Sequence, residues 1–375
     1  MNGSRHKDNG LRDLTAALLA DAGANGGANG GASAGVNAAD VLGRASRVGG
    51  MDDAQHLAAC VRYWGQQRIQ PMIARRLLAD ASLPPAWLDW ARGVWGDNGV
   101  RALLHIKHLV AAERLLSAHG IPMLPIKGVV LSTLLHGDPG FRRCGDIDIV
   151  VPPDAFDTAV ALLQAQGYRA RHAEHMTPDG RLRPALKRCR NEVGLIGPQG
   201  DHILEVHHRL CKYRGMFADD FDGLLADTTV VPLAGRDWRT IGRRTLIAYL
   251  AFHAMISRWS AMKWLLDVPA AIDRLGPESI EHAYAAARRG SFVPLLDAAL
   301  VLGHRLVGRP EPGPRGSASS CRRLVRAVWR RMGDGRYAVE DQRDPLQMIG
   351  YRLTLVTGVA ARWRMAETSA LSLVL

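Results

Sequence analysis

The sequence is poor in cysteine and contains no long hydrophobic run. Its five cysteines are scattered over 375 residues without a C-x-x-C pair, which argues against a disulfide framework and against a zinc site built on thiolates. No stretch reaches the roughly 18 consecutive apolar residues that a membrane-spanning helix needs. The opening MNGSRHKDNG is not followed by the apolar segment of a signal peptide. These absences predict a cytoplasmic protein with no membrane partner.

Basic charge is what the chain has in excess. Lys and Arg total 48 and Asp and Glu total 36, so the formal net charge is +12. Half of this excess falls in residues 312–375, which contain eleven arginines and five acidic residues. Such a charge favours a polyanion as a partner. A solvated helix face is the alternative explanation for the C-terminal arginines.

Composition and periodicity divide the chain into five regions. Residues 1–45 contain the run DAGANGGANGGASAGVN and are expected to form a flexible leader. Residues 46–119 and 236–310 have apolar residues at the three- and four-residue spacing of helices. Residues 120–235 mix short strands with helices, which predicts an α+β core. The last region, 311–375, is expected to be a basic helical tail.

Three strands are expected in the core, at residues 146–151, 192–196 and 202–208, the last two joined by the hairpin turn GPQG. The first strand reads DIDIVV, so Asp146 and Asp148 point to the same face, within reach of one cation. Mg²⁺ suits such a pair because it prefers hard oxygen ligands and shares its shell with substrate phosphates. An acidic outer face of a surface strand is the alternative, and D-x-D alone does not decide between them.

Features around this strand favour a metal site. Lys127-Gly128 ends a short apolar run, where backbone amides and a helix N-terminus can receive phosphate. Arg142 comes shortly before the two aspartates and offers a cation to a triphosphate. Glu205 lies between apolar neighbours, where burial without a partner is costly. His207 shares a strand face with Glu205 and either contacts phosphate or a carboxylate, or is a packed histidine.

These residues lie within a longer pattern. The run IKGVVLSTLLHGDPGFRRCGDIDIVV and the segment LEVHHRL at 204–210 resemble the bacterial "uncharacterised nucleotidyltransferase" branch of the DNA polymerase β superfamily. The resemblance extends over roughly residues 50–310. It implies a polymerase-β-like nucleotidyltransferase core of the α+β class, with a small mixed sheet flanked by helical regions on both sides.

The resemblance also implies a set of ligands. Asp146, Asp148 and Glu205 would bind two Mg²⁺ ions, with Mn²⁺ as the alternative metal. Lys127, Gly128 and Arg142 match the family's lysine, glycine and arginine positions at the nucleoside triphosphate, for which ATP is expected. The Gly-Ser or Gly-Gly doublet of the wider superfamily is absent, and Lys-Gly stands in its place at a longer spacing.

The expected activity is metal-dependent transfer of a nucleoside monophosphate from NTP to a hydroxyl of a small molecule or peptide, with release of pyrophosphate. Members of the family occur near genes for natural products, including lasso peptides, which suggests natural-product biosynthesis. One alternative is a phosphotransferase of the same fold. The other is a non-enzymatic nucleic-acid-binding protein that uses the basic C-terminal helices.

The helical flanks are expected to bind the acceptor. His253 and Lys263 are the polar groups expected nearest to it, and Lys263 with Asp267 has the spacing of an ordinary helix pair. The pairs His105/His108 and His172/His175 have helical spacing without a third ligand nearby in the sequence. They are therefore expected to be surface histidines.

Overall fold

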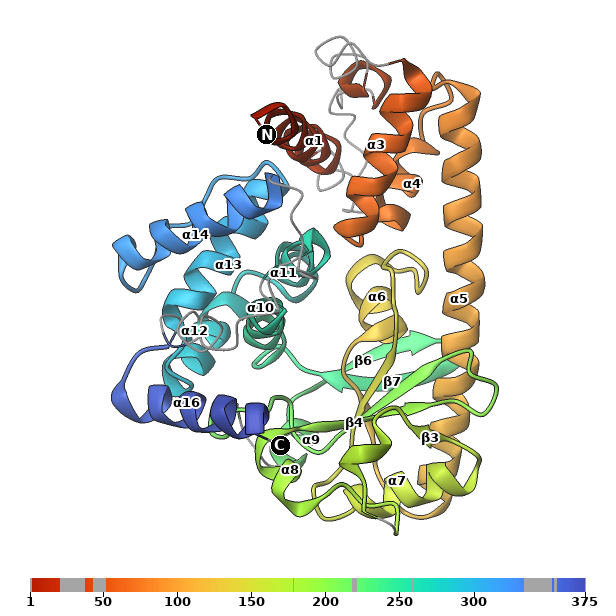
Figure 1. The fold of residues 1–375 in the computed structure, drawn as a ribbon, viewed down its shortest axis with the longest axis vertical. Helices are drawn as coiled ribbons and strands as arrows, with labels where there is room; N and C mark the ends of the chain where they lie inside the picture. The colour runs from red at the N-terminus through yellow and green to blue at the C-terminus, as the bar shows by residue number, and fades with distance from the viewer. Residues whose placement is uncertain are drawn as a thin grey trace.

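The computed structural model describes residues 2–20, 38–42, 52–177, 179–217, 221–257, 259, 261–333, 353 and 356–374. The strands lie in the lower part of the molecule as drawn in Figure 1, and helices from both ends of the chain gather above and beside them. Within these described ranges, no helix is both long enough and apolar enough to cross a membrane.

In the described part of the chain, the N-terminal group includes the helices α1 (Asn2–Ala20), α3 (Asp53–Gln66), α4 (Gln70–Leu77) and α5 (Pro85–Ala118). Helix α5 has 34 residues and runs beside both the other N-terminal helices and the sheet (Figure 1). The flexible leader expected over residues 1–45 is wrong for α1, because Leu14 and Leu18 are buried and α1 packs against helices of the C-terminal group. The Gly, Ala and Asn run at 21–37 lies outside the described residues.

The central sheet has five strands in the order β1-β2-β5-β4-β3. They are β1 (Leu124–Pro125), β2 (Ile147–Val150), β3 (Arg169–Ala170), β4 (Glu192–Ile196) and β5 (Ile203–His207). Strands β2 and β5 are parallel, whereas the other neighbours are antiparallel. The expected α+β class with a small mixed sheet is thus confirmed, as is the hairpin between β4 and β5.

Three helices connect these strands: α6 (Gly128–His136), α7 (Phe156–Ala165) and α8 (Pro184–Cys189). A single 3-10 turn, η2 (Ala173–His175), follows β3. Helix α6 packs against β2, and α7 packs against β5 and α5. Helices α6 and α7 thus pack on the two central strands of the sheet.

A second, two-stranded sheet was not expected from the sequence. Strands β6 (Thr228–Leu233) and β7 (Arg236–Ile241) form an antiparallel hairpin after the short helix α9 (Phe221–Leu225). The hairpin packs at the β1 edge, where Thr240 Oγ1 donates to the carbonyl of Pro125 at 2.6 Å. The boundary expected between residues 235 and 236 falls in the turn of this hairpin.

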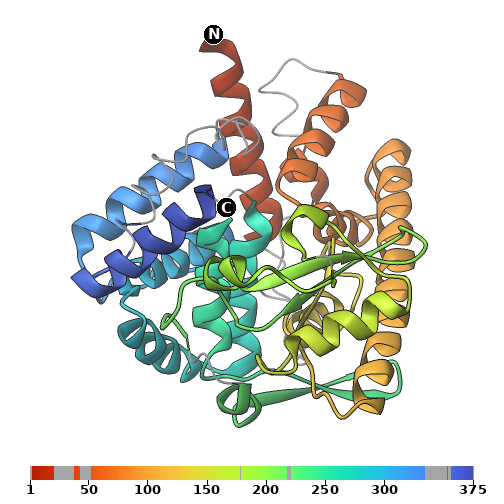
Figure 2. The same cartoon turned by 60° about the horizontal axis from the view of Figure 1, so that its bottom comes forward.

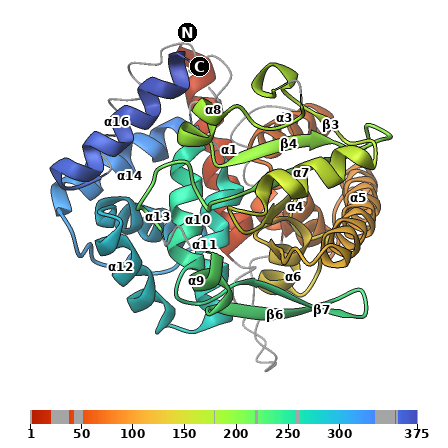
Figure 3. The same ribbon diagram turned by 90° about the horizontal axis from the view of Figure 1, so that it is seen from below.

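The C-terminal group contains six described helices: α10 (Leu246–Ile256), α11 (Met262–Leu275), α12 (Ser279–Arg289), α13 (Val293–Leu306), α14 (Ala318–Gly333) and α16 (Val359–Val374). Helix α10 is buried along almost its whole length and lies with α11 near the centre of the molecule (Figure 3). Helices α14 and α16 gather on the side opposite α5 (Figure 2). In α14 the buried side is apolar and includes Val325 and Val328, so the arginines face outward.

Candidate active site

Asp148 and Glu205 come together through the register of two parallel strands. Asp148 on β2 is the register partner of Glu205 on β5, and the strand period of two places His207 on the same face as Glu205. Lys127 stands at the start of α6, two residues after β1. Strand pairing thus brings carboxylates that are distant in the sequence together on one face of the sheet, at its central strands.

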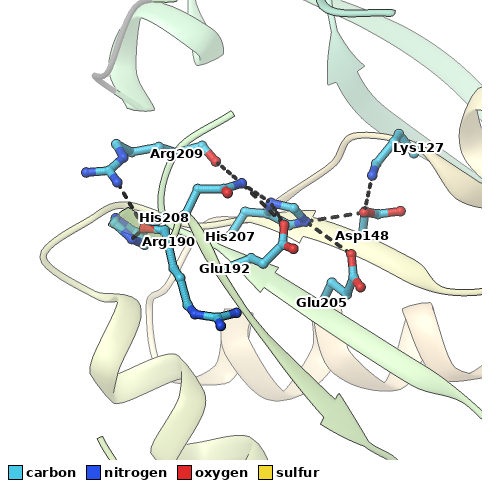
Figure 4. A network of polar contacts seen from close by, with 9 residues as sticks. Lys127, Asp148, Arg190, Glu192, Glu205, His207, His208 and Arg209 are labelled. Carbon is cyan, nitrogen blue, oxygen red and sulfur yellow. Dashed lines mark hydrogen bonds and ion pairs between the residues drawn. The ribbon is translucent and has the colours of Figure 1, made fainter. Parts of the chain in front are cut away.

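A continuous polar network crosses these strands (Figure 4). Lys127 Nζ lies 2.6 Å from Asp148 Oδ1, and His207 Nε2 lies 3.2 Å from the same oxygen. Asp148 and His207 are each only 2% exposed. Asp148 Oδ1 is thus shared by Lys127 and His207.

The network continues to two residues that the sequence did not suggest. Glu192 Oε2 lies 3.1 Å from His207 Nδ1, and Asn191 Nδ2 lies 3.1 Å from the same nitrogen. Glu192 is the register partner of His207 on β4. The sequence predicts that residues 192–196 form a hairpin with the strand that contains His207. Counting residue pairs outward from the hairpin turn would have placed Glu192 beside His207.

One cavity contains all seven residues that are expected to contact the metal ions or the nucleotide. Its volume is about 950 Å³. The expected residues in its lining are Lys127, Gly128, Arg142, Asp146, Asp148, Glu205 and His207. The structure therefore brings every candidate site residue to a single place, and their individual roles remain predictions.

The carboxylates differ in their protonation behaviour. Burial favours a raised pKa for Asp148, but Lys127 and His207 outweigh it and hold the pKa of Asp148 below its usual value. The negative charge of Asp148 raises the pKa of Asp146, with burial adding to the effect. Burial, with the charges of Asp148 and Glu192, raises the pKa of Glu205 to about 9. Without a cation the site therefore holds more carboxylates than it can ionise.

The donor set fits a divalent cation. Asp148, Glu205 and His207 each offer a ligand atom, and these atoms lie within 4.8 Å of one another. Asp146 lines the same cavity, and its carboxylate makes no hydrogen bond or ion pair within the described part of the chain. Hard carboxylate oxygens are the ligands that Mg²⁺ and Mn²⁺ prefer. Burial and the charges of Asp148 and Glu192 raise the pKa of Glu205, and a bound cation would offset both by stabilising the ionised carboxylate.

Comparison with known protein families identifies the chain. A family model described as "uncharacterised nucleotidyltransferase" matches residues 53–308. The chain belongs to this family. The expectation of an enzyme of the nucleotidyltransferase class is thereby confirmed.

The solved structures that match this nucleotidyltransferase include two of one antibiotic-resistance protein. One is the solution structure of the antibiotic-resistance factor ANT(2'')-Ia, with 18% identity and a TM-score of 0.34 over 50% of this chain and 92% of that chain. The other is the crystal structure of ANT(2'')-Ia in complex with adenylyl-2''-tobramycin, with 18% identity and a TM-score of 0.33 over 50% and 97% of the two chains. No curated protein matches the sequence.

Arg142 of this nucleotidyltransferase is held by a partner from a distant helix. Its Nε and Nη2 donate to the two oxygens of Asp267 on α11 at 2.6 and 2.5 Å. Its Nη1 lies 3.5 Å from the carbonyl oxygen of Gly128. The expected pairing of Lys263 with Asp267 is wrong, because Lys263 Nζ donates instead to the carbonyl of Arg143 at 2.9 Å.

The Lys127-Gly128 turn has a geometry that requires glycine. Gly128 begins α6 with φ +63, a left-handed conformation that other residues adopt only with strain. A Cβ at this position would also lie 3.5 Å from the carbonyl oxygen of Asp146. The turn therefore brings the first amides of α6 close to the D-x-D strand.

The two residues expected near the acceptor also line the cavity, together with Trp264. Burial lowers the pKa of His253 well below its ordinary value. Burial, with the charge of Arg142, lowers the pKa of Lys263 to about 8. The helical flank thus supplies this wall of the cavity with a neutral imidazole and an amine of reduced basicity.

The remaining histidine pairs are not all on the surface. His105 is only 4% exposed, so the expectation of a surface residue is wrong there. His172 is exposed and His175 is partly buried. His108 stacks on His202, a residue distant in sequence, with a ring separation of 3.5 Å.

Proposed function

We propose that the protein transfers a nucleoside monophosphate from a metal-bound NTP to a hydroxyl of a small molecule or peptide. The observation that supports this most is the register pairing of Asp148 with Glu205, which gathers carboxylates from two strands beside Lys127 in one cavity. The acceptor oxygen forms a bond to the α-phosphorus, and the bond from that phosphorus to the bridging oxygen breaks. Pyrophosphate leaves, and the hydroxyl proton passes to water.

Asp146, Asp148 and Glu205 are the residues that would hold two Mg²⁺ ions, with Mn²⁺ as a substitute. Such ions lower the pKa of an acceptor hydroxyl and neutralise the charge of a triphosphate. His207 positions this set, because its two nitrogens lie next to Asp148 and Glu192. Its ring thereby fixes the orientation of the Asp148 carboxylate.

Lys127 and Gly128 contact the phosphates in this proposal. The ammonium of Lys127 stands at the carboxylates, and the first turn of α6 presents unpaired amides beside it. Arg142 has a different role from the one that its sequence position suggested. Because Asp267 occupies two of its nitrogens, Arg142 contributes mainly by supporting the carbonyl of Gly128. The nucleotide proposed is ATP.

The test begins with nucleotide binding, because the acceptor is not needed for it. Calorimetry with α,β-methylene analogues of the four NTPs, each with Mg²⁺ or Mn²⁺, should show metal-dependent binding to the wild-type protein. Asp148→Asn should abolish that dependence, whereas Asp237→Asn, an exposed aspartate on β7, should not. Binding that is unaffected by Asp148→Asn would refute the proposed metal site.

The mass of the product then decides the reaction type. Incubation with NTP and candidate hydroxyl compounds should increase the acceptor mass by a nucleoside monophosphate. An increase by one phosphate would instead establish the phosphotransferase alternative. Metal-independent binding of nucleic acid with a steep salt dependence would favour the third interpretation.

A further inference from the structure

Two basic residues flank the carboxylates, one next to each edge strand of the sheet. The strand order is β1-β2-β5-β4-β3, with Lys127 two residues after β1 and Arg171 directly after β3. Asp148 and Glu205 lie on β2 and β5 between them. Neighbouring strands are about 4.8 Å apart, so Lys127 and Arg171 stand on opposite sides of the proposed reaction centre.

Gly194 leaves space for Arg171 beside Glu205. It is the register partner of Glu205 on β4 and has no side chain to occupy that face. The backbone N–H of Arg171 donates to the Gly194 carbonyl at 2.8 Å. A Cβ at residue 194 would lie 3.6 Å from Cβ and Cδ of Arg171. The stem of Arg171 therefore lies across Gly194 and lines the same cavity as Glu205.

Arg190 reaches the same space from the end of α8. Its carbonyl oxygen is held by His208 Nε2 at 3.2 Å and by Arg209 Nη2 at 2.9 Å, so its backbone is fixed. Its Nη2 lies 3.3 Å from His175 Nε2, and the close view shows it on the same side of the network as Glu205 (Figure 4). A side cavity of about 100 Å³ is lined by both arginines and Glu205 and adjoins the main one.

Neither guanidinium has an acidic partner. Among the described residues, no carboxylate oxygen lies within 4.0 Å of a nitrogen of Arg171 or Arg190. Glu192 shares the cavity, but its Oε2 is engaged by His207 at 3.1 Å. Arginine presents a planar set of donors that matches carboxylate and phosphate oxygens. The two arginines line the same cavity as Glu192 and Glu205 but pair with neither among the described residues, so their donors are available to bind an oxyanion.

We infer that Arg171 and Arg190 bind a carboxylate or phosphate group of the acceptor substrate. The inference rests on the proposed nucleotidyl transfer, in which the attacking oxygen and the leaving pyrophosphate lie in line on opposite sides of the α-phosphorus. Lys127 and Gly128 hold the leaving side, so the acceptor enters from the side of β4 and β3. There it meets the two arginines, which repel a polycationic acceptor and attract an anionic one.

The test uses the full-length protein saturated with Mg²⁺ and the α,β-methylene NTP that it binds, so that the nucleotide's phosphate positions are filled. Titration with inorganic phosphate, and separately with acetate, should then show binding of one anion. Arg171→Gln and Arg190→Gln should each weaken it, and the double variant should weaken it by about tenfold or more. The stronger binder of the two probes indicates which oxyanion the acceptor carries.

Arg188→Gln is the matched control, because Arg188 is exposed on α8 and lines neither cavity. It should bind the anion as the wild type does. Absence of anion binding to the nucleotide-saturated wild type, or equal binding by the folded double variant, would overturn the inference. If the proposed function is wrong, the nucleotide analogue itself will show no metal-dependent binding. That result is distinct from a loss of anion binding by the nucleotide-saturated protein.

Discussion

Arg142 and Asp267 form a buried ion pair with two parallel hydrogen bonds of 2.6 and 2.5 Å. The pair ties the loop before the D-x-D strand to α11, and each side chain is at most 4% exposed. Burial opposes the charge of Arg142, but Asp267 outweighs it and raises the pKa of the guanidinium. The sheet and the C-terminal helices are therefore joined at the floor of the proposed nucleotide site.

Breaking this pair should be costly. Asp267→Ala leaves a guanidinium buried without its counter-charge, so the free energy of unfolding should fall by about 3–5 kcal/mol. Replacing both residues by leucine should cost less than the single change, because no charge is then left buried. Urea denaturation of the three proteins measures these differences.

Asp273→Ala provides the control on the same helix. Asp273 pairs with Arg309 through two bonds of 2.6 and 2.7 Å, but the pair is much more exposed. Its loss should change stability by about 1 kcal/mol or less. If Asp267→Ala were as mild as Asp273→Ala, the buried pair would not join the two parts of the fold as described.

Asp146→Asn and Asp148→Asn should affect stability in opposite directions. Asp146 is the carboxylate whose pKa is raised by the charge of Asp148, so removing its charge relieves repulsion and should leave stability equal or slightly higher. Asp148 neutralises the buried Lys127 at 2.6 Å, so Asp148→Asn should cost about 3 kcal/mol. Both variants should lose turnover. Thermal unfolding and an assay of pyrophosphate release separate the two effects.

The sequence was sufficient for the local features of this site and insufficient for its long-range pairs. Side chains alternate between the two faces of a strand, and this follows from local chain geometry. The sequence alone therefore predicts that Asp146 and Asp148 share one face of their strand, and that Glu205 and His207 share one face of theirs. Nothing local specifies that Arg142 pairs with Asp267 rather than with phosphate. That choice depends on how α11 docks against the sheet, which is a tertiary property.

The missed hairpin and the misjudged leader have different physical reasons. Strands β6 and β7 form a hairpin whose first strand contains Pro232, and proline weakens the pattern of a strand. Helix α1 is stabilised by burying Leu14 and Leu18 against distant helices. The neighbouring Gly, Ala and Asn run has the composition of a flexible linker, and nothing local in the sequence separates α1 from it.

Three histidines, of which His105 and His208 are buried and His136 is partly buried, should make the fold sensitive to acid. Burial is the largest cause that lowers the pKa of His105, His136 and His208 to about 4. Because the folded-state pKa lies below the unfolded value of about 6.5, the folded state binds fewer protons between these values. The stability that neutral histidine provides is therefore complete above pH 6.5 or so and is lost as the pH falls towards 4.

His105→Leu tests this for one residue. Nδ1 of His105 is buried with no hydrogen-bond partner, so leucine should be tolerated at neutral pH. Between about pH 7 and pH 4.5 the variant should lose about 2 kcal/mol less stability than the wild type. His119→Leu, at an exposed position at the end of α5, should keep the wild-type dependence. Urea titrations at both pH values check the prediction, and parallel curves for His105→Leu and wild type would contradict it.

Gly194→Val should block the proposed acceptor subsite without changing its charge. The added side chain would occupy the space between Arg171 and Glu205, since even a Cβ there lies 3.6 Å from the Arg171 stem. Valine suits a strand better than glycine does, so stability should be equal or higher. Binding of phosphate to the nucleotide-saturated protein should weaken by about tenfold or more, while binding of the nucleotide analogue stays unchanged. Gly194→Ala, whose single methyl makes only an ordinary contact, should bind phosphate nearly as the wild type does. A valine variant that still binds phosphate normally would show that the anion does not lie across Gly194.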